Sequence, residues 1–135
     1  NVKRVPIAFI LSELICKNKK KVNFKSWADF KASFTYIDDV CEVIFKMIKL
    51  KKFTFSLYNF GSGKNYLLRD IIKFINKNYK QKKIFAGKGY IPWSNDSIIR
   101  GPLVSLKHRN FFKPTTNIYK GVKKYISFIK GNDHA

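Results

Sequence analysis

Two neighbouring carboxylates, Asp38 and Asp39, are the side chains most suggestive of acid/base or metal chemistry in this sequence. Either role needs carboxylates that converge on one substrate or one ion. Adjacent residues on a helix point in different directions, so these two do not form a converging pair. A carboxylate at the start of a helix instead favours the positive end of the helix dipole. We therefore predict that the two aspartates cap a helix.

A glycine-rich turn, Gly61-Ser62-Gly63-Lys64, is the second candidate for chemistry, because such turns let the backbone approach phosphate groups. A dinucleotide site has three glycines between a strand and a helix, followed by a later acidic residue. This turn has two glycines and no such acid. A P-loop ends in Gly-Lys-Ser/Thr, whereas Asn65 follows the lysine here. We predict a plain strand-to-helix turn and keep phosphate binding as the alternative.

The histidines and cysteines form no recognisable catalytic or metal-binding pattern. His108 and His134 are far apart in the sequence, and there is no CxxC motif or Cys/His cluster. Cys16 and Cys41 each lie in an apolar helical stretch, so we expect buried free thiols in a reducing cytosol. From the residues alone we assign no catalytic and no metal-binding side chain.

The net charge of +20 comes from 28 basic and 8 acidic residues. Such a charge could attract nucleic acid or an anionic lipid surface. Only four of the basic residues are arginine, although arginine binds phosphates and bases better than lysine does, because its guanidinium donates two hydrogen bonds at once. Lys, Asn, Ile, Phe and Tyr are all abundant, as AT-rich coding would produce. We interpret the charge as compositional and expect no nucleic-acid partner, with a basic nucleic-acid-binding module kept as an alternative.

The apolar content predicts a folded domain with no membrane span. The 135 residues are 45% hydrophobic and include 13 Phe, which is enough to build a core. The longest apolar run, Val5 to Cys16, contains Ser12 and Glu13 and is too short to cross a bilayer. No small-residue cleavage site follows it. We expect a cytoplasmic protein with no membrane partner.

The hydrophobic periodicity predicts helices that alternate with short strands, an α/β class with an α+β-like arrangement. We predict helices over residues 5–18 and 39–50, a third that begins near residue 68, and a fourth that begins after Asn117 as its N-cap. The apolar faces of the last three helices are, in order, Val40, Ile44, Met47 and Ile48; Leu68, Ile71, Ile72 and Ile75; and Ile118, Val122, Tyr125, Ile126 and Ile129. We predict strands over 21–25, 33–37, 54–60 and 83–86.

Three segments, taken in order, carry a family resemblance. They are Phe34–Val40, which leads into an apolar helix; Leu57–Gly63, which leads to the helix around Asp70–Ile72; and Phe112–Thr116, followed by Gly121-Val122. Their order and spacing resemble the C-terminal part of the extended short-chain dehydrogenase/reductases, the NAD-dependent epimerases and dehydratases of nucleotide sugars. The resemblance extends over nearly the whole chain.

The resemblance implies that residues 1–135 form a single partial domain, the substrate-binding C-terminal lobe, without the N-terminal Rossmann half. That half would bind NAD(P) and carry the Tyr-x-x-x-Lys catalytic pair, and the apolar faces described above would lie against it. Tyr79 and Lys83 share the spacing of that pair but stand in the wrong part of the sequence. We expect this chain alone to bind no cofactor and to be inactive. Because it begins at Asn1 and not at Met, we also expect upstream sequence.

The chain departs from the family pattern at two places. Ala32 and Ser33 stand where the family usually has Arg-Asp, and Ser26-Trp27-Ala28 stands at the family's Gly-Asp-Gly hairpin. In the family, the arginine binds the diphosphate through two hydrogen bonds. The side chain of Ala32 provides neither a charge nor a hydrogen-bond donor. A remnant with no catalytic role is therefore an alternative to a working lobe.

The resemblance suggests a nucleotide sugar as the partner and four substrate contacts: Val5, Pro6, Phe24 and Arg100. Phe24 would pack on the nucleobase. Arg100 would meet a phosphate, although it could also be a solvated surface residue. The identity of the sugar nucleotide and the type of reaction (epimerisation, dehydration or reduction) stay open, as does a homodimer in the full-length form.

Overall fold

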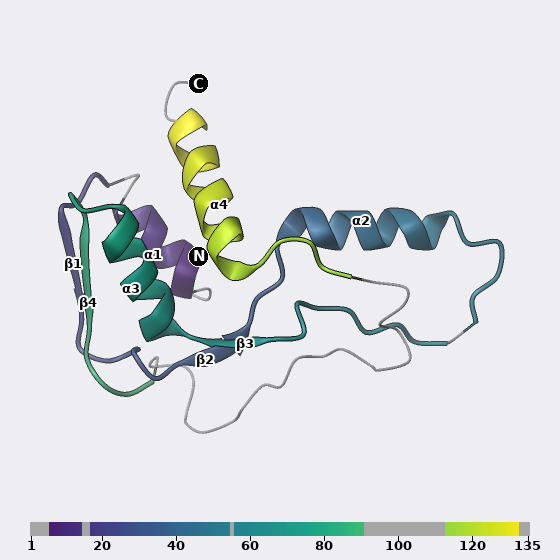
Figure 1. The fold of residues 1–135 in the computed structure, drawn as a ribbon, viewed down its shortest axis with the longest axis horizontal. Coiled ribbons are helices and arrows are strands. Elements are labelled where there is room, and N and C mark those ends of the chain that lie inside the picture. The colour runs from purple at the N-terminus through teal and green to yellow at the C-terminus, as the bar shows by residue number, and fades with distance from the viewer. Residues whose placement is uncertain (1–5, 15–16, 55, 91–112, 133–135) are drawn as a thin grey trace.

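The computed structural model describes residues 6–14, 17–54, 56–90 and 113–132, in which helices and short strands are mixed (Figure 1). This mixture confirms the predicted α/β class. The elements follow one another as α1 (Pro6–Leu14), β1 (Lys21–Phe24), β2 (Lys31–Ser33), α2 (Ile37–Ile48), β3 (Asn65–Leu67), α3 (Leu68–Asn78), β4 (Lys83–Ala86) and α4 (Ile118–Asn132).

Within the described residues, the strands form two small sheets of two strands each. β1 and β4 are parallel, with Val22 opposite Ile84, and both side chains are buried. β2 and β3 are antiparallel, with Ala32 opposite Tyr66. The strands predicted over 21–25 and 83–86 are confirmed as β1 and β4. Successive side chains of a strand point to opposite faces, so each of these strands turns one apolar side chain toward the core.

Two predicted strands are wrong, and two short strands, β2 and β3, were missed. The segment 33–37 leaves β2 at Ser33 and enters α2 at Ile37, so its β-forming residues make an extended link. The described residues of the segment 54–60 form no strand. A strand needs a neighbour to take up its backbone hydrogen bonds, and in the described ranges both sheets lie elsewhere. β2 and β3 were missed because each has only three residues.

The hydrophobic core lies between the β1–β4 sheet and helices α1, α3 and α4 (Figure 1). The stripe predicted for α3 is confirmed. All four of its members are buried, and Leu68 and Ile71 are fully enclosed. The predicted face of α4 is also confirmed, with Val122, Ile126 and Ile129 buried. Asn117 caps α4 as predicted, because its Oδ1 accepts a hydrogen bond of 2.9 Å from the backbone N–H of Lys120.

Glu13 on α1 makes the stability of the fold depend on pH. Its carboxylate pairs with the ammonium groups of Lys17 and Lys19, and both hydrogen bonds hold the pKa of Glu13 below its ordinary value. A lowered folded-state pKa stabilises the fold at pH values above the unfolded pKa, and this stabilisation is lost as the pH falls through the folded pKa. We expect Glu13→Gln to be less stable than the wild type at pH 7.

The difference between Glu13→Gln and the wild type should shrink as the pH falls from the ordinary glutamate pKa of about 4.3 through the lowered folded-state pKa of Glu13, below which neither side chain is charged. Urea unfolding at several pH values, followed by circular dichroism, measures that difference. A difference that stays constant from pH 7 to pH 3 would contradict the ion pair as its cause.

Candidate functional site

Phe24 and Trp27 form an aromatic pair at the carboxyl end of β1. Their ring centroids lie 4.1 Å apart and the rings are 17° from parallel. Trp27 is buried and has a φ of 99°, a left-handed conformation that a bulky residue rarely adopts. Its backbone N–H donates a hydrogen bond of 3.1 Å to the carbonyl of Gly89. This bond holds the connection that presents Phe24 at the end of the sheet.

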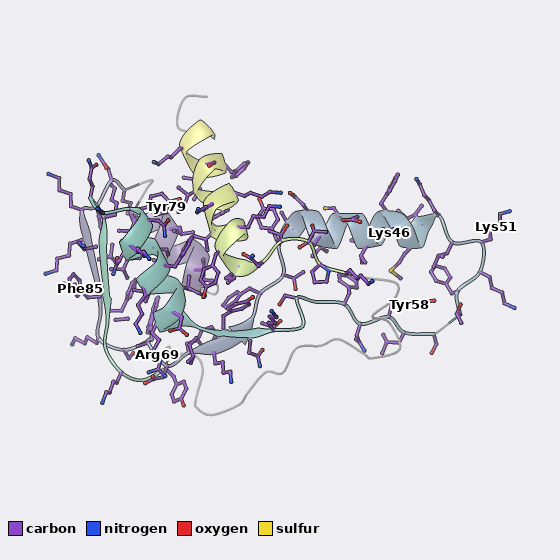
Figure 2. The ribbon with its side chains drawn as sticks, viewed as in Figure 1. Lys46, Lys51, Tyr58, Arg69, Tyr79 and Phe85 are labelled. Carbon is purple, nitrogen blue, oxygen red and sulfur yellow. The ribbon has the colours of Figure 1, made fainter. Side chains whose placement is uncertain are left out.

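The connection after β4 is hydrogen-bonded to the segment that follows β1. The N–H of Gly89 donates to Oδ2 of Asp29 at 2.7 Å, and Asp29 also lies 3.4 Å from the guanidinium of Arg69. The N–H of Arg69 donates to the carbonyl of Ala28. Figure 2 shows Arg69 at the N-terminal end of α3. This exposed arginine was missed by the sequence analysis, because only the fold brings it beside the 25–30 segment.

Of the four predicted substrate contacts, the structure gives side-chain surroundings for one. Phe24 is half-buried and packs on Trp27, as described above. Pro6 is the first residue of α1, and only its backbone is described. Val5 and Arg100 lie outside the described residues. The predicted grouping of these four residues therefore stays a prediction.

Asp39 is buried, with 2% of its surface exposed, and it joins α2 to the segment before α4. Its Oδ1 accepts hydrogen bonds from the backbone N–H and the hydroxyl of Thr115 at 3.1 and 2.9 Å. Its Oδ2 accepts a bond from the backbone N–H of Thr116 at 3.1 Å. One carboxylate thus satisfies two backbone donors that lie 76 and 77 residues further along the chain.

The prediction that the two aspartates cap a helix is wrong. The N-cap of α2 is Tyr36, with no side-chain capping bond, and both aspartates lie inside the first turn. Asp38 is exposed and pairs with Lys124 of α4 at 2.7 Å, and this hydrogen bond raises the pKa of Lys124. The two carboxylates do point apart, as expected for adjacent helical residues.

The turn at Gly61–Lys64 is fastened to the end of β2. The N–H of Ser62 donates to Oγ1 of Thr35 at 3.1 Å, and the hydroxyls of Ser33 and Ser62 are 3.0 Å apart. The turn leads into β3, not into a helix as predicted. In the described part of the chain, β3 separates this turn from the N-terminus of α3, and the amide of Ser62 already donates a hydrogen bond to Thr35. This geometry favours a structural turn over a phosphate cradle.

Segments far apart in the sequence therefore meet at residues 33–39. Ser33 and Thr35 hold the 61–64 turn, and Asp39 holds the backbone of residues 115–116. A hollow of about 260 Å³ lies beside this junction. It is lined mostly by apolar side chains of α1, α4 and the 34–37 link, so it offers few donors for a sugar or a phosphate.

The described residues do not provide a cofactor site or a catalytic pair. They contain no group of three His, Cys, Asp or Glu residues that could hold a metal ion. They also contain no glycine-rich strand-to-helix turn for a dinucleotide. Burial raises the pKa of Tyr79, the opposite of what a phenolate base needs, and Figure 2 shows this residue at the C-terminal end of α3.

Two further expectations concern exposure and membranes. Cys41 was predicted to be a buried thiol, but it is exposed, because the side of α2 that carries it faces away from the core. Cys16 lies outside the described residues. Across the described ranges, no helix has both the length and the apolar character needed to cross a membrane.

No protein-family model matches the chain. An uncharacterised protein of Methanocaldococcus jannaschii, MJ1055, is 29% identical over 115 residues. The match covers 84% of this chain and 34% of that protein, so the chain spans about a third of its length.

Solved structures of nucleotide-sugar enzymes share the fold. The NAD-dependent NDP-hexosamine 5,6-dehydratase TunA matches with a TM-score of 0.73 at 15% identity, over 96% of this chain and 41% of that chain. The UDP-glucose 4-epimerase of Thermotoga maritima gives 0.69 at 14% identity, over 94% and 40%.

The UDP-glucuronic acid 4-epimerase of Bacillus cereus, solved with UDP-glucuronic acid and NAD, gives a TM-score of 0.68 at 18% identity, over 96% of this chain and 40% of that chain. The alignment with all three enzymes thus covers most of this chain and about two fifths of theirs. The chain has the fold of one part of an extended short-chain dehydrogenase/reductase of the nucleotide-sugar epimerase and dehydratase type.

Proposed function

We propose that residues 1–135 are a single partial domain, the substrate-side lobe of an NAD(P)-dependent nucleotide-sugar epimerase, dehydratase or reductase. The observation that carries the proposal is the junction at residues 33–39. There, parts of the three segments that resemble the family are joined by hydrogen bonds that Thr35 and Asp39 accept from backbone N–H groups. The shared fold supports the same assignment. We place the protein in the cytoplasm.

The lobe supplies substrate contacts and leaves the redox chemistry to the nucleotide-binding half. Hydride transfer needs a bound nicotinamide cofactor with a base held beside it. The described residues offer no dinucleotide turn, and burial raises the pKa of Tyr79. NAD(P) would therefore bind to the Rossmann half, and this chain alone would be inactive. In this proposal, Val5, Pro6, Phe24 and Arg100 contact the nucleotide sugar.

The test is a fusion of this chain to the nucleotide-binding half of the Thermotoga maritima epimerase, in place of the segment that matches here. Calorimetry then measures NAD and UDP-glucose binding, and a coupled assay measures UDP-galactose formation. Binding of both ligands supports the proposal. A folded fusion that binds NAD, but neither UDP-glucose nor any other nucleotide sugar in a panel, rejects the substrate-lobe assignment.

Phe24→Ala tests the nucleobase contact within this fusion. Stacking of a base on an aromatic ring is worth about 1–3 kcal/mol, so we expect about a 5- to 160-fold loss of UDP-glucose affinity with NAD affinity unchanged. Phe85→Ala is the matched control, because Phe85 lies on the neighbouring strand β4 and is 51% exposed. Equal losses for the two variants would remove Phe24 from the site.

A remnant without catalytic role is the second candidate, and one observation favours it. Ala32 stands in β2 opposite Tyr66, where the family resemblance calls for a diphosphate-binding arginine. Its methyl group cannot hold a phosphate. Reading the gene upstream of Asn1 distinguishes the two proposals, because an intact Rossmann fingerprint and Tyr/Lys pair would reject the remnant.

A further inference from the structure

Trp27 follows strand β1 in a backbone conformation that is costly for a tryptophan. Its φ of 99° lies in the left-handed region, which glycine enters freely and bulky residues avoid. Its backbone N–H donates to the carbonyl of Gly89, and its own carbonyl accepts from the N–H of Phe30, each at 3.1 Å. A glycine could make the same two hydrogen bonds without strain. The reason for a tryptophan at this position therefore lies in its side chain.

The side chain of Trp27 covers one face of the ring of Phe24. The two ring centroids lie 4.1 Å apart, and the ring planes are 17° from parallel. Two rings at this separation leave no space for a third ring between them. A nucleobase that stacks on Phe24 must therefore use the ring face that is turned away from Trp27. The indole itself is 7% exposed, so it offers a ligand almost no surface of its own.

Phe24 benefits from a fixed neighbour because it is the last residue of β1. Its side chain is half-buried, and the pairing of β1 with β4 ends at Phe24 and Ala86. An aromatic side chain at the end of a strand can take several orientations, and losing this freedom when a ligand binds reduces the affinity. The contact with Trp27 restricts the ring before any ligand arrives.

Hydrogen bonds on both sides of Trp27 keep it in place without a ligand. The N–H of Ala28 donates to the carbonyl of Gly87 at 3.1 Å. The hydroxyl of Ser26 donates to the carbonyl of Tyr90 at 2.8 Å. The segments that follow β1 and β4 are thus joined before and after Trp27 in the chain. The aromatic pair is therefore a pre-formed surface at this end of the sheet.

We propose that Trp27 is a positioning residue of the nucleotide site, which fixes the ring of Phe24 and confines the base to one face of that ring. The ligand is a nucleotide with a planar base. This inference rests on the proposed function, in which Phe24 contacts the nucleobase. Trp27 stands where the chain departs from the family, because Ser26-Trp27-Ala28 replaces the Gly-Asp-Gly hairpin.

Trp27→Leu tests this role in the fusion with the nucleotide-binding half of the Thermotoga maritima epimerase, because leucine is apolar but has no ring. Calorimetry measures the affinity for UDP, for NAD, and for 5,6-dihydro-UDP, whose base is not planar. An aromatic pair contributes about a 2- to 13-fold effect beyond its buried area, so we expect UDP affinity to fall by that factor. The affinities for NAD and 5,6-dihydro-UDP should not change. Trp27→Phe keeps a ring and should retain most of the UDP affinity.

A positioning residue acts only through the residue that it positions. In a fusion that carries Phe24→Ala, the further change Trp27→Leu should therefore leave UDP affinity unchanged. Ile129→Ala is the matched control for damage to the core, because Ile129 on α4 is also 7% exposed. It should lower the unfolding midpoint and leave UDP affinity unchanged.

Three results would overturn the positioning role. The first is an equal loss of UDP affinity in Trp27→Leu and Ile129→Ala, which would indicate general damage to the core. The second is an equal loss of affinity for UDP and 5,6-dihydro-UDP. The third is a loss from Trp27→Leu that persists in the Phe24→Ala background.

A spectroscopic measurement on the unsubstituted fusion complements the leucine variant and does not depend on its folding. Tryptophan is replaced by 5-fluorotryptophan, and the fluorine signal that is missing in Trp27→Phe is assigned to Trp27. We expect UDP to move this signal, because the base stacks on the ring that Trp27 contacts, and glucose 1-phosphate to leave it in place. A Trp27 signal that does not respond to saturating UDP would contradict the proposal.

The positioning role and the proposed function can fail separately. If the fusion binds UDP through Phe24 and Trp27 but binds no nucleotide sugar, the substrate-lobe assignment fails and the positioning role stands. If the fusion binds UDP-glucose and Trp27→Leu leaves UDP affinity unchanged, the positioning role fails and the substrate lobe stands. A folded fusion that binds neither UDP nor any nucleotide sugar rejects both.

Discussion

Asp39→Asn is expected to lower the free energy of unfolding by about 3 kcal/mol, while Asp38→Asn leaves it nearly unchanged. The carboxylate of Asp39 accepts hydrogen bonds from the backbone N–H groups of Thr115 and Thr116 and from the Thr115 hydroxyl. An amide keeps one acceptor oxygen and directs an NH₂ group at a remaining donor. A buried donor then has no partner, and this costs more than the loss of an ordinary hydrogen bond.

Asp38 is the matched control, because it neighbours Asp39 on the same helix and pairs with Lys124 at the surface. The two side chains of that pair are 60% and 42% exposed, and exposed ion pairs contribute little. Urea denaturation of both variants gives the comparison. Hydrogen exchange should also show faster exchange at Thr115 and Thr116 in Asp39→Asn. Equal unfolding midpoints for the two variants would contradict the role of the buried carboxylate.

Gly87→Ala is expected to destabilise the protein by about 3 kcal/mol. A Cβ at this position would lie 2.1 Å from the backbone carbonyl oxygen of Lys25, much closer than two such atoms can approach. The N–H of Gly87 donates to the carbonyl of Phe24, and its own carbonyl accepts from Ala28, each at 3.1 Å. The backbone must therefore shift at the corner that carries the aromatic pair.

Gly131→Ala serves as the control, because nothing lies within 4 Å of a Cβ added there and the residue is on helix α4. Alanine loses less backbone entropy than glycine on folding into a helix, so this variant should gain about 0.5–1 kcal/mol. Thermal and urea unfolding of both variants measures the opposite signs. A Gly87→Ala protein as stable as the wild type would show that the two connections do not approach as closely as described.

The elements that the sequence predicted well are those that depend on interactions between residues close together in the sequence. The stripe of α3 and the face of α4 repeat with the period of a helix, and the structure buries both. Asn117 caps α4 through a bond to a residue three positions away. The strands around Val22 and Ile84 needed only one apolar side chain each, turned toward those helices.

The features that the sequence mispredicted depend on partners far along the chain. Asp39 is of a residue type that commonly caps helices. Its role as a buried hydrogen-bond acceptor depends on Thr115, which only the fold brings beside it. Thr54–Phe60 has the composition of a strand, but the described residues place no neighbouring strand against it. For the same reason the sequence could not show that Ser62 is held by Thr35.

The sequence by itself determined which apolar residues share a helical face, the start of α4 after Asn117, and the order of the motifs that resemble the nucleotide-sugar enzymes. The tertiary structure decided which apolar faces are covered. The face of α3 lies in the core, whereas Ile44 and Ile48 of the face predicted for α2, equally regular in the sequence, are exposed. Periodicity is set by local geometry, but burial depends on what packs against a face, and that is a property of the whole fold.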